Sequence, residues 1–174
     1  MNCTISEIKM GSICIKSKTV SPLHNPTEPC FLSLTKVTIR HCHSLRELTL
    51  LMFASNLKEL EVRNADQLED IINEKKACEG GESGIVPFPK LVSLKLRNLR
   101  ELTNIYWSPL RFPCLKKFEV IECPYLKKLP LDSQSGIHGE NELVVGYREE
   151  SWIVRVEWED EATKTRFLSS CKYV

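Results

Sequence analysis

One apolar pattern recurs four times along this chain of 174 residues, and no other feature restricts the possible folds so strongly. The pattern is L-x-x-L-x-L-x-x-(C/A/L)-x-x-L-x-x-(L/I), in which Val, Ile or Phe replaces some of the leucines. Its copies begin near residues 34, 57, 91 and 115, so successive starts are 23, 34 and 24 residues apart. Agreement at six positions in four copies indicates a repeat protein, in which one unit cannot bury its apolar face without a neighbour.

The spacing is typical of leucine-rich repeats, whose unit is about 20–29 residues long. The L-x-L core alternates inward apolar and outward polar residues, as a half-buried strand does. We therefore expect short strands near 35–40, 58–63, 92–97 and 116–121. The predicted fold class is α/β: a leucine-rich-repeat solenoid with short parallel strands on its concave face, an irregular convex side and a C-terminal strand-plus-helix cap.

The repeats divide the chain into three predicted parts. Residues 1–30 resemble a partial repeat, with Cys3 at the template's cysteine position, followed by a proline-rich loop. Residues 31–131 hold the four repeats, and 73–86, rich in glycine and charge, are expected to be an inserted solvated loop. Residues 132–174 are predicted to form a loop and a C-terminal cap. Because an uncapped solenoid end exposes its core, we expect this chain to be the C-terminal piece of something longer.

The predicted cap combines strands and a helix. Residues 143–147 and 152–158 alternate apolar and polar side chains, which predicts two strands, or one strand and a turn. Residues 159–168 predict a short helix, because acidic residues occupy the first turn and basic residues come later, as the helix dipole favours. Trp152 and Trp158 are expected to cover the apolar face of the last repeat.

A phenylalanine stands just before each repeat. Phe53, Phe88 and Phe112 precede the later three repeats, and Phe31 holds a similar place before the first. We expect these rings to be buried at the repeat junctions and to stack along the solenoid.

The turn after each strand normally carries Asn or Cys in such repeats, because a short polar side chain satisfies backbone groups there. Cys42 and Cys123 are expected to do so, whereas Ala65 and Leu99 cannot, so their turns are expected to be looser. All eight cysteines are expected to be reduced thiols, because neither a Cys-x-x-Cys pair nor a secretory signal occurs.

The outward strand positions are predicted to line up in columns across the sheet, because neighbouring strands lie about 4.8 Å apart. A row of like charges costs energy unless it is paired, and Glu61 is a plausible partner for the arginines. We expect these residues, apart from Ile121, to bind an acidic partner, the alternative being a solvated face of mixed charge. The columns are Lys36, Glu59, Ser93 and Lys117; Thr38, Glu61, Lys95 and Glu119; and Arg40, Arg63, Arg97 and Ile121.

Composition argues against two other classes of protein. The chain has 24 basic against 23 acidic residues, whereas dedicated nucleic-acid binders are usually strongly basic. No stretch approaches the roughly 18 apolar residues of a membrane span, and the first residues do not form a signal peptide.

No motif for catalysis, metal binding or nucleotide binding is present. His41-Cys42-His43 suggests a metal, but neighbouring strand residues point to opposite faces and no second ligand pair is visible. There is no G-x-S-x-G elbow and no positioned base, so we expect no enzymatic activity. No Gly-Lys dipeptide occurs, so no phosphate-binding loop and no cofactor are expected in this chain.

The repeats and the ending together resemble a known family. The segments LTKVTIRHCHSLRELT, LKELEVRNADQLEDII, FPKLVSLKLRNLRELTNIY and FPCLKKFEVIECPYLKKLP are similar to the C-terminal repeats of plant intracellular disease-resistance receptors. The subclass is the coiled-coil, nucleotide-binding, leucine-rich-repeat (NBS-LRR) type. The ending WEDEATKTRFL at 158–168 is similar to the tail of that subclass and is more diagnostic than the repeat. The resemblance extends from Cys3 to Cys171.

The resemblance implies a cytoplasmic protein-interaction and autoinhibitory segment of an immune receptor that acts against pathogens. Its protein partners would be a pathogen effector, a guarded host protein or the receptor's own nucleotide-binding module, and ADP or ATP would bind only in that module. Two alternatives remain open. One is a stand-alone fragment of a decayed receptor gene, and the other is an adaptor repeat domain that selects proteins for ubiquitination, although this chain lacks an F-box-like segment.

Overall fold

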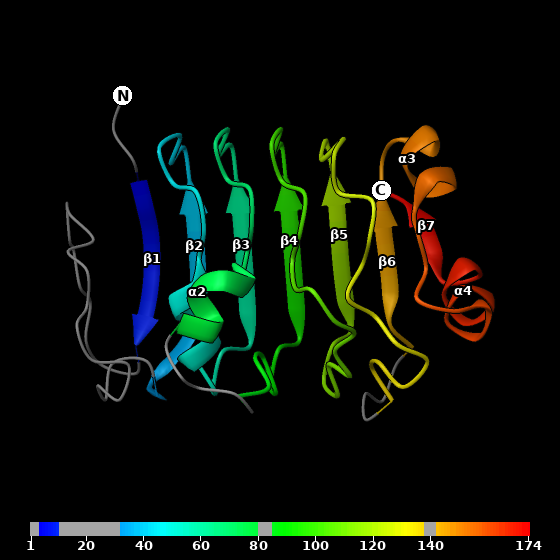
Figure 1. Cartoon of the computed structure of the whole chain (residues 1–174), viewed down its shortest axis with the longest axis horizontal. Coiled ribbons are helices and arrows are strands. Elements are labelled where there is room, and N and C mark those ends of the chain that lie inside the picture. Colours follow the sequence, from blue (N-terminus) through cyan, green and yellow to red (C-terminus); the bar gives the residue numbers. More distant parts are fainter. Residues whose placement is uncertain (1–3, 11–31, 80–84, 138–141) are drawn as a thin grey trace.

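The computed structural model describes residues 4–10, 32–79, 85–137 and 142–174, with the backbone alone for the first of these segments. One sheet of seven strands follows the order of the chain (Figure 1). β2 to β7 run parallel to one another, and β1 is antiparallel to β2. The strands are β1 (Thr4–Met10), β2 (Leu34–Arg40), β3 (Glu59–Arg63), β4 (Ser93–Arg97), β5 (Lys117–Ile121), β6 (Val144–Tyr147) and β7 (Cys171–Tyr173).

The core consists of the repeated apolar positions. Every template position of the second, third and fourth repeats is at most 1% exposed. In the first repeat, Leu45 and Leu48 are only partly buried. Burial of a Leu or Val side chain contributes roughly 1.5–3 kcal/mol, so stacked repeats stabilise one another. The predicted solenoid, with parallel strands on one face and an irregular opposite side, is confirmed.

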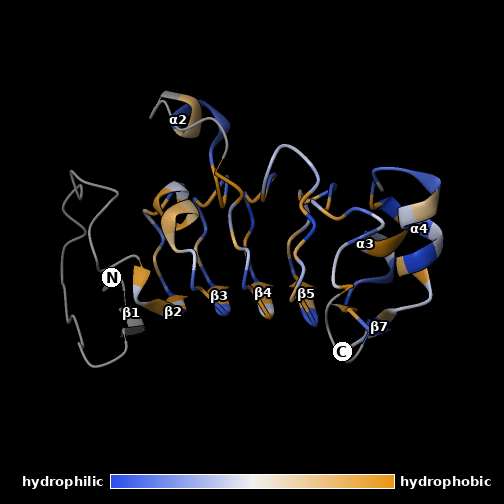
Figure 2. Cartoon of the chain, turned by 90° about the horizontal axis from the view of Figure 1, so that it is seen from below, coloured by the Kyte–Doolittle hydropathy of each residue, from blue (hydrophilic) through white to orange (hydrophobic). Residues whose placement is uncertain are grey.

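The convex side has little regular structure. A short ladder joins Glu47, Asp70 and Asn104 of successive repeats, and a 3-10 helix, η1, covers Thr49–Phe53. Figure 2 shows the strands along one side of the molecule and the convex segments opposite them. Among the predicted phenylalanines, the buried rings of Phe88 and Phe112 stack with centroids 6.5 Å apart. The half-buried Phe53 packs against the core, and Phe31 lies outside the described residues.

The expected loop at 73–86 begins with a helix. α2 (Glu74–Glu79) stands out from the convex side in Figure 2. Asn73 accepts a hydrogen bond from the backbone N–H of Lys76, as an N-terminal cap does, and Lys76 Nζ lies 2.8 Å from Glu47. This segment is therefore anchored to the first repeat, and residues 80–84 lie outside the described ranges.

The C-terminal cap adds two parallel strands and two helices beyond the fourth repeat, α3 (Glu150–Arg155) and α4 (Glu161–Leu168). β6 and α4 agree with the expected strand and helix. The strand expected at 152–158 is wrong over its first half, which is α3, whereas Glu157 forms a bridge with Lys128.

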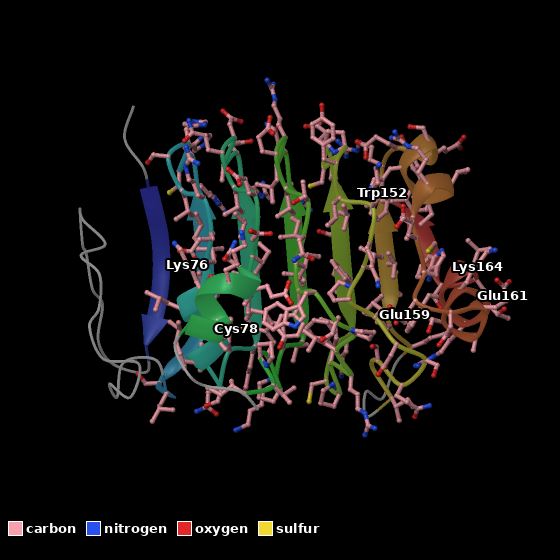
Figure 3. The ribbon with its side chains drawn as sticks, in the orientation of Figure 1. Lys76, Cys78, Trp152, Glu159, Glu161 and Lys164 are labelled. Atoms are coloured by element: carbon pink, nitrogen blue, oxygen red, sulfur yellow. The ribbon has the colours of Figure 1, made fainter. Side chains whose placement is uncertain are left out.

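Trp152 closes the last repeat. Its side chain, labelled in Figure 3, is 3% exposed, and its indole N–H donates to the Leu126 carbonyl oxygen at 2.7 Å. Trp158 instead stacks on Phe167 of α4, with centroids 6.3 Å apart.

β1 differs from the expected partial repeat. Thr4 pairs with Arg40 and Met10 with Leu34, so β1 is a strand of the sheet rather than the convex half of a repeat. An antiparallel neighbour satisfies backbone groups along the edge of β2 that would otherwise be unpaired. Cys3 and the proline-rich loop lie outside the described residues, and the three-part division of the chain remains a prediction.

The turns after the strands share one backbone conformation. His41, Asn64, Asn98 and Glu122 each follow a strand and have φ between 51° and 57°. The turns at Ala65 and Leu99 close with backbone hydrogen bonds of 3.1 and 3.4 Å, and those at the two cysteines with bonds of 3.2 and 3.3 Å. The expectation of a looser turn is therefore wrong at Ala65, where the backbone closes the turn as tightly as at the cysteines, whereas the turn at Leu99 has the longest of the four bonds.

Cys42 also departs from expectation. It is disulfide-bonded, so the prediction that every cysteine is a reduced thiol is wrong at this position. Cys78, Cys114, Cys123 and Cys171 are free thiols.

Candidate functional site

The concave face of the sheet carries the predicted columns in the predicted register. Lys36 pairs in register with Glu59, then Ser93 and Lys117. The second column runs Thr38, Glu61, Lys95 and Glu119, and the third runs Arg40, Arg63, Arg97 and Ile121. A parallel sheet of equal repeats aligns equivalent residues, so one short strand pattern becomes three rows of side chains.

Glu61 lies between two arginines of the third column. Its Oε1 atom is 3.4 Å from Arg40 and 2.5 Å from Nε of Arg63. Lys36 and Glu59 form a separate ion pair at 2.9 Å at the other end of the strands. The row of arginines is thus partly compensated from the neighbouring column, which lowers the repulsion between like charges.

Glu119 is the most buried charged group of this face, with a side chain only 4% exposed. Arg97 lies 2.8 Å from one of its oxygens and Lys117 lies 2.7 Å from the other. Burial alone would raise the pKa of Glu119, but the bonds with Lys117 and Arg97 outweigh it and the pKa is lowered. Glu119 is therefore a carboxylate at neutral pH and orients both cations.

The backbone of β6 covers Glu119. A Cβ atom on Gly146 would lie 3.1 Å from Cγ of Glu119 and 3.2 Å from a methyl carbon of Val174. The absence of a side chain at Gly146 lets these groups approach the sheet closely. The same contacts bury Glu119 at the end of the charged face.

Positive charge exceeds negative charge on this face. The eleven residues of the predicted partner-binding set include six cations and three carboxylates, a net charge of +3. Each carboxylate is within ion-pair distance of a cation, whereas Lys95 has no ion pair within the described part of the chain. Thr38, like Glu119, is almost fully buried and shapes the face without being accessible to a partner.

Two features of this face were missed by sequence reasoning. Asn98 donates a side-chain hydrogen bond to Asn64 at 2.8 Å, and Asn64 lies 3.3 Å from a ring nitrogen of His41. Beside this row, a pocket is lined partly by Arg63, Arg97 and Arg148. Asn64 and Asn98 occupy equivalent repeat positions, so the sequence could have predicted their hydrogen bond. Arg148 follows β6, outside the repeat pattern, so nothing in the sequence predicted its place in the pocket.

Other chemistry receives no support from the geometry. Over 32–79, 85–137 and 142–174 no three His, Cys, Asp or Glu residues are grouped as metal ligands are. His43 pairs with Asp66 at 2.6 Å.

Burial raises the pKa of Cys123 to about 12 and that of Cys171 to about 11, so both thiols are protonated and poor nucleophiles at neutral pH. None of the helices in the described segments has the length and apolar character to cross a bilayer.

Comparison with known proteins supports the resemblance. The family model described as "Plant disease resistance protein RPS2-like, leucine-rich repeats" matches residues 5–134. Among curated proteins of Arabidopsis thaliana, disease resistance protein RPS5 is 52% identical over 171 residues, which are 97% of this chain and 19% of the relative. Disease resistance protein SUMM2 is 47% identical over 98% of this chain and 18% of its own length.

A third relative, disease resistance protein UNI, is 42% identical over 98% of this chain and 19% of its own length. The chain thus spans about a fifth of the length of the curated relatives it matches. No solved structure matches it. With its parallel repeats, its template core and this family match, the chain belongs to the leucine-rich-repeat family of RPS2-like plant disease resistance proteins.

Proposed function

We propose that this chain is a protein-binding segment of an intracellular plant immune receptor, and that it binds an acidic protein surface through its concave face. The single observation that carries the proposal is the net charge of +3 on the aligned columns. Complementary charge steers partners together and sets their orientation. Such a segment binds rather than catalyses, and its partner is a pathogen effector, a guarded host protein or the receptor's own nucleotide-binding module.

Contact with the nucleotide-binding module would make the segment autoinhibitory. Contacts between this face and an acidic surface of the module would stabilise the inactive state of the receptor. An effector, or a host protein that an effector has altered, would compete for the same face and shift the equilibrium towards the active state. ADP and ATP would bind in the module and not in this chain.

The test is a binding titration of the chain with the part of RPS5 that lies outside the matched segment. Arg63→Glu with Arg97→Glu reverses two charges of the third column and should weaken binding about tenfold or more at low salt. Lys95→Glu is a second variant, at a residue that forms no ion pair in the described residues. It should weaken binding in the same direction.

The matched control is Arg46→Glu with Arg155→Glu. Both arginines are exposed and lie off the concave columns, one in the turn after β2 and the other at the end of α3. Equal affinities for the concave variants and this control would contradict the proposal.

A further inference from the structure

A small pocket lies at the C-terminal ends of β3 to β5, at the edge of the concave face. Its volume is about 260 Å³, enough for a single side chain rather than for a folded element. Its lining residues come from three repeats and from the segment after β6. They are Arg63, Asn64, Arg97, Asn98, Ile121, Glu122, Arg148 and Val174.

Three guanidinium groups meet at this pocket from separate elements. Arg63 is the last residue of β3, Arg97 is the last residue of β4, and Arg148 follows β6. Glu122 and the C-terminal carboxylate of Val174 are the two carboxylates among the lining residues, so with three arginines they carry a net charge of +1. Arginine forks bind carboxylates in a bidentate geometry, which makes this lining suited to an oxyanion.

Two of the three arginines keep unused hydrogen-bonding capacity. The Nε atom of Arg97 is buried and has no hydrogen-bond partner, whereas Nε of Arg63 already lies 2.5 Å from a carboxylate oxygen of Glu61. The Arg148 side chain donates from Nε to an oxygen of the C-terminal carboxylate of Val174 at 3.2 Å, and its other two nitrogens have no hydrogen bond within the described residues. A buried donor without a partner costs about 1–3 kcal/mol, so a ligand that brings an acceptor to Arg97 relieves an existing cost.

We propose that this pocket binds one carboxylate side chain, from an Asp or Glu of the acidic protein partner. The inference rests on the proposed function, and it adds a defined subsite to a diffuse charged face. The carboxylate of the partner lies between the guanidinium groups of Arg97, Arg63 and Arg148. Glu122 disfavours a group of higher negative charge, so a carboxylate is selected over a phosphate monoester.

The first experiment uses the whole chain with acetyl-hexaglutamate amide as the probe, followed by NMR of the arginine side-chain N–H signals. Saturable shifts are expected for Arg63, Arg97 and Arg148, whereas Arg46, which pairs with Glu69 away from the pocket, should not shift. A hexapeptide with one phosphoserine in place of glutamate should bind no more tightly. Tighter binding of the phosphopeptide would overturn the carboxylate assignment.

The second experiment separates this inference from the proposed function. Arg148→Gln removes a pocket residue that is not in the charged columns, and it should lower the affinity for the peptide about tenfold. Arg46→Gln is the matched control and should leave the affinity unchanged. If Arg148→Gln has no effect while Lys95→Glu weakens binding, the pocket is refuted and the charged face stands. If neither variant has an effect, both proposals fail.

Discussion

Glu119 shows how one residue supports the whole concave face. It is the central carboxylate of a triad with Arg97 and Lys117, and it is almost fully buried. If it were neutral, two cations would lie side by side without a shared partner. The sequence pattern placed Glu119 correctly in the second column, but it could not show that Gly146 and Val174 would bury it.

Glu119→Gln should lower the free energy of unfolding by about 1–3 kcal/mol at pH 7, because it leaves two charged donors facing an amide. The pKa of Glu119 is lower in the folded chain than its ordinary value. Its stabilising effect is therefore complete above the ordinary pKa and is lost as pH falls through the folded pKa. Below about pH 4 the difference between the native chain and the variant should shrink.

Urea unfolding at pH 7 and at pH 3 measures both effects. Glu59→Gln is the matched control, since Glu59 is half-exposed and its pair with Lys36 should contribute at most about 1 kcal/mol. A cost for Glu119→Gln that stays constant from pH 7 to pH 3 would refute the role assigned to this carboxylate.

At the scale of elements, the sequence predicted the strands and the register that the repeat determines. The four strands and their register follow from a period of two at fixed spacing, so the columns could be written down from residue numbers alone. The pocket could not, because its third arginine depends on how the chain turns after β6. The helix α2 was missed because glycine and charge dominate its segment.

The error at 152–158 has a particular cause. Trp152, Val154, Val156 and Trp158 alternate like a strand, but Val154 is 83% exposed. The buried residues are Trp152, which lies in α3, and Val156, the extended residue that follows the helix. A strand period of two residues and a helix period of about 3.6 residues both fit so short a segment. The packing of Trp152 on the last repeat favours the helix.

Trp152→Ala should cost about 3–5 kcal/mol, because it opens the end of the last repeat and leaves the Leu126 carbonyl without its indole donor. Val154→Ala, in the same helix, should change the free energy of unfolding by no more than about 0.5 kcal/mol. Thermal and urea unfolding compare the two. Similar costs for both variants would mean that α3 does not close the solenoid.

The repeat pattern ends after β5 with a specific contact. In the repeats, the backbone N–H after each strand donates to a carbonyl of the next strand, as Asn98 does to Ile121 at 2.9 Å. At the end of β5 the carboxylate of Glu149 accepts the N–H of Glu122 instead, at 3.1 Å. A carboxylate thus takes the place of the backbone carbonyl that the next strand supplies in the repeats, so the repeat pattern can end after β5.

The whole molecule presents two chemically different sides. The concave side carries the charged columns, and the convex side, opposite the strands, carries irregular segments and α2 (Figure 2). The solenoid holds equivalent side chains in register over several repeats, so a partner would meet the charged columns as one rigid surface. The central claim is that a protein partner covers this concave face.

Lysine footprinting by mass spectrometry tests that claim most directly, with the chain labelled alone and in complex with the rest of RPS5. Lys117 on the concave face and Lys164 on α4 have side chains of similar exposure, 50% and 46%, so they form a matched pair. The account predicts that labelling of Lys95 and Lys117 falls on binding while that of Lys164 does not change. Protection of Lys164 with unchanged labelling of Lys95 and Lys117 would contradict it.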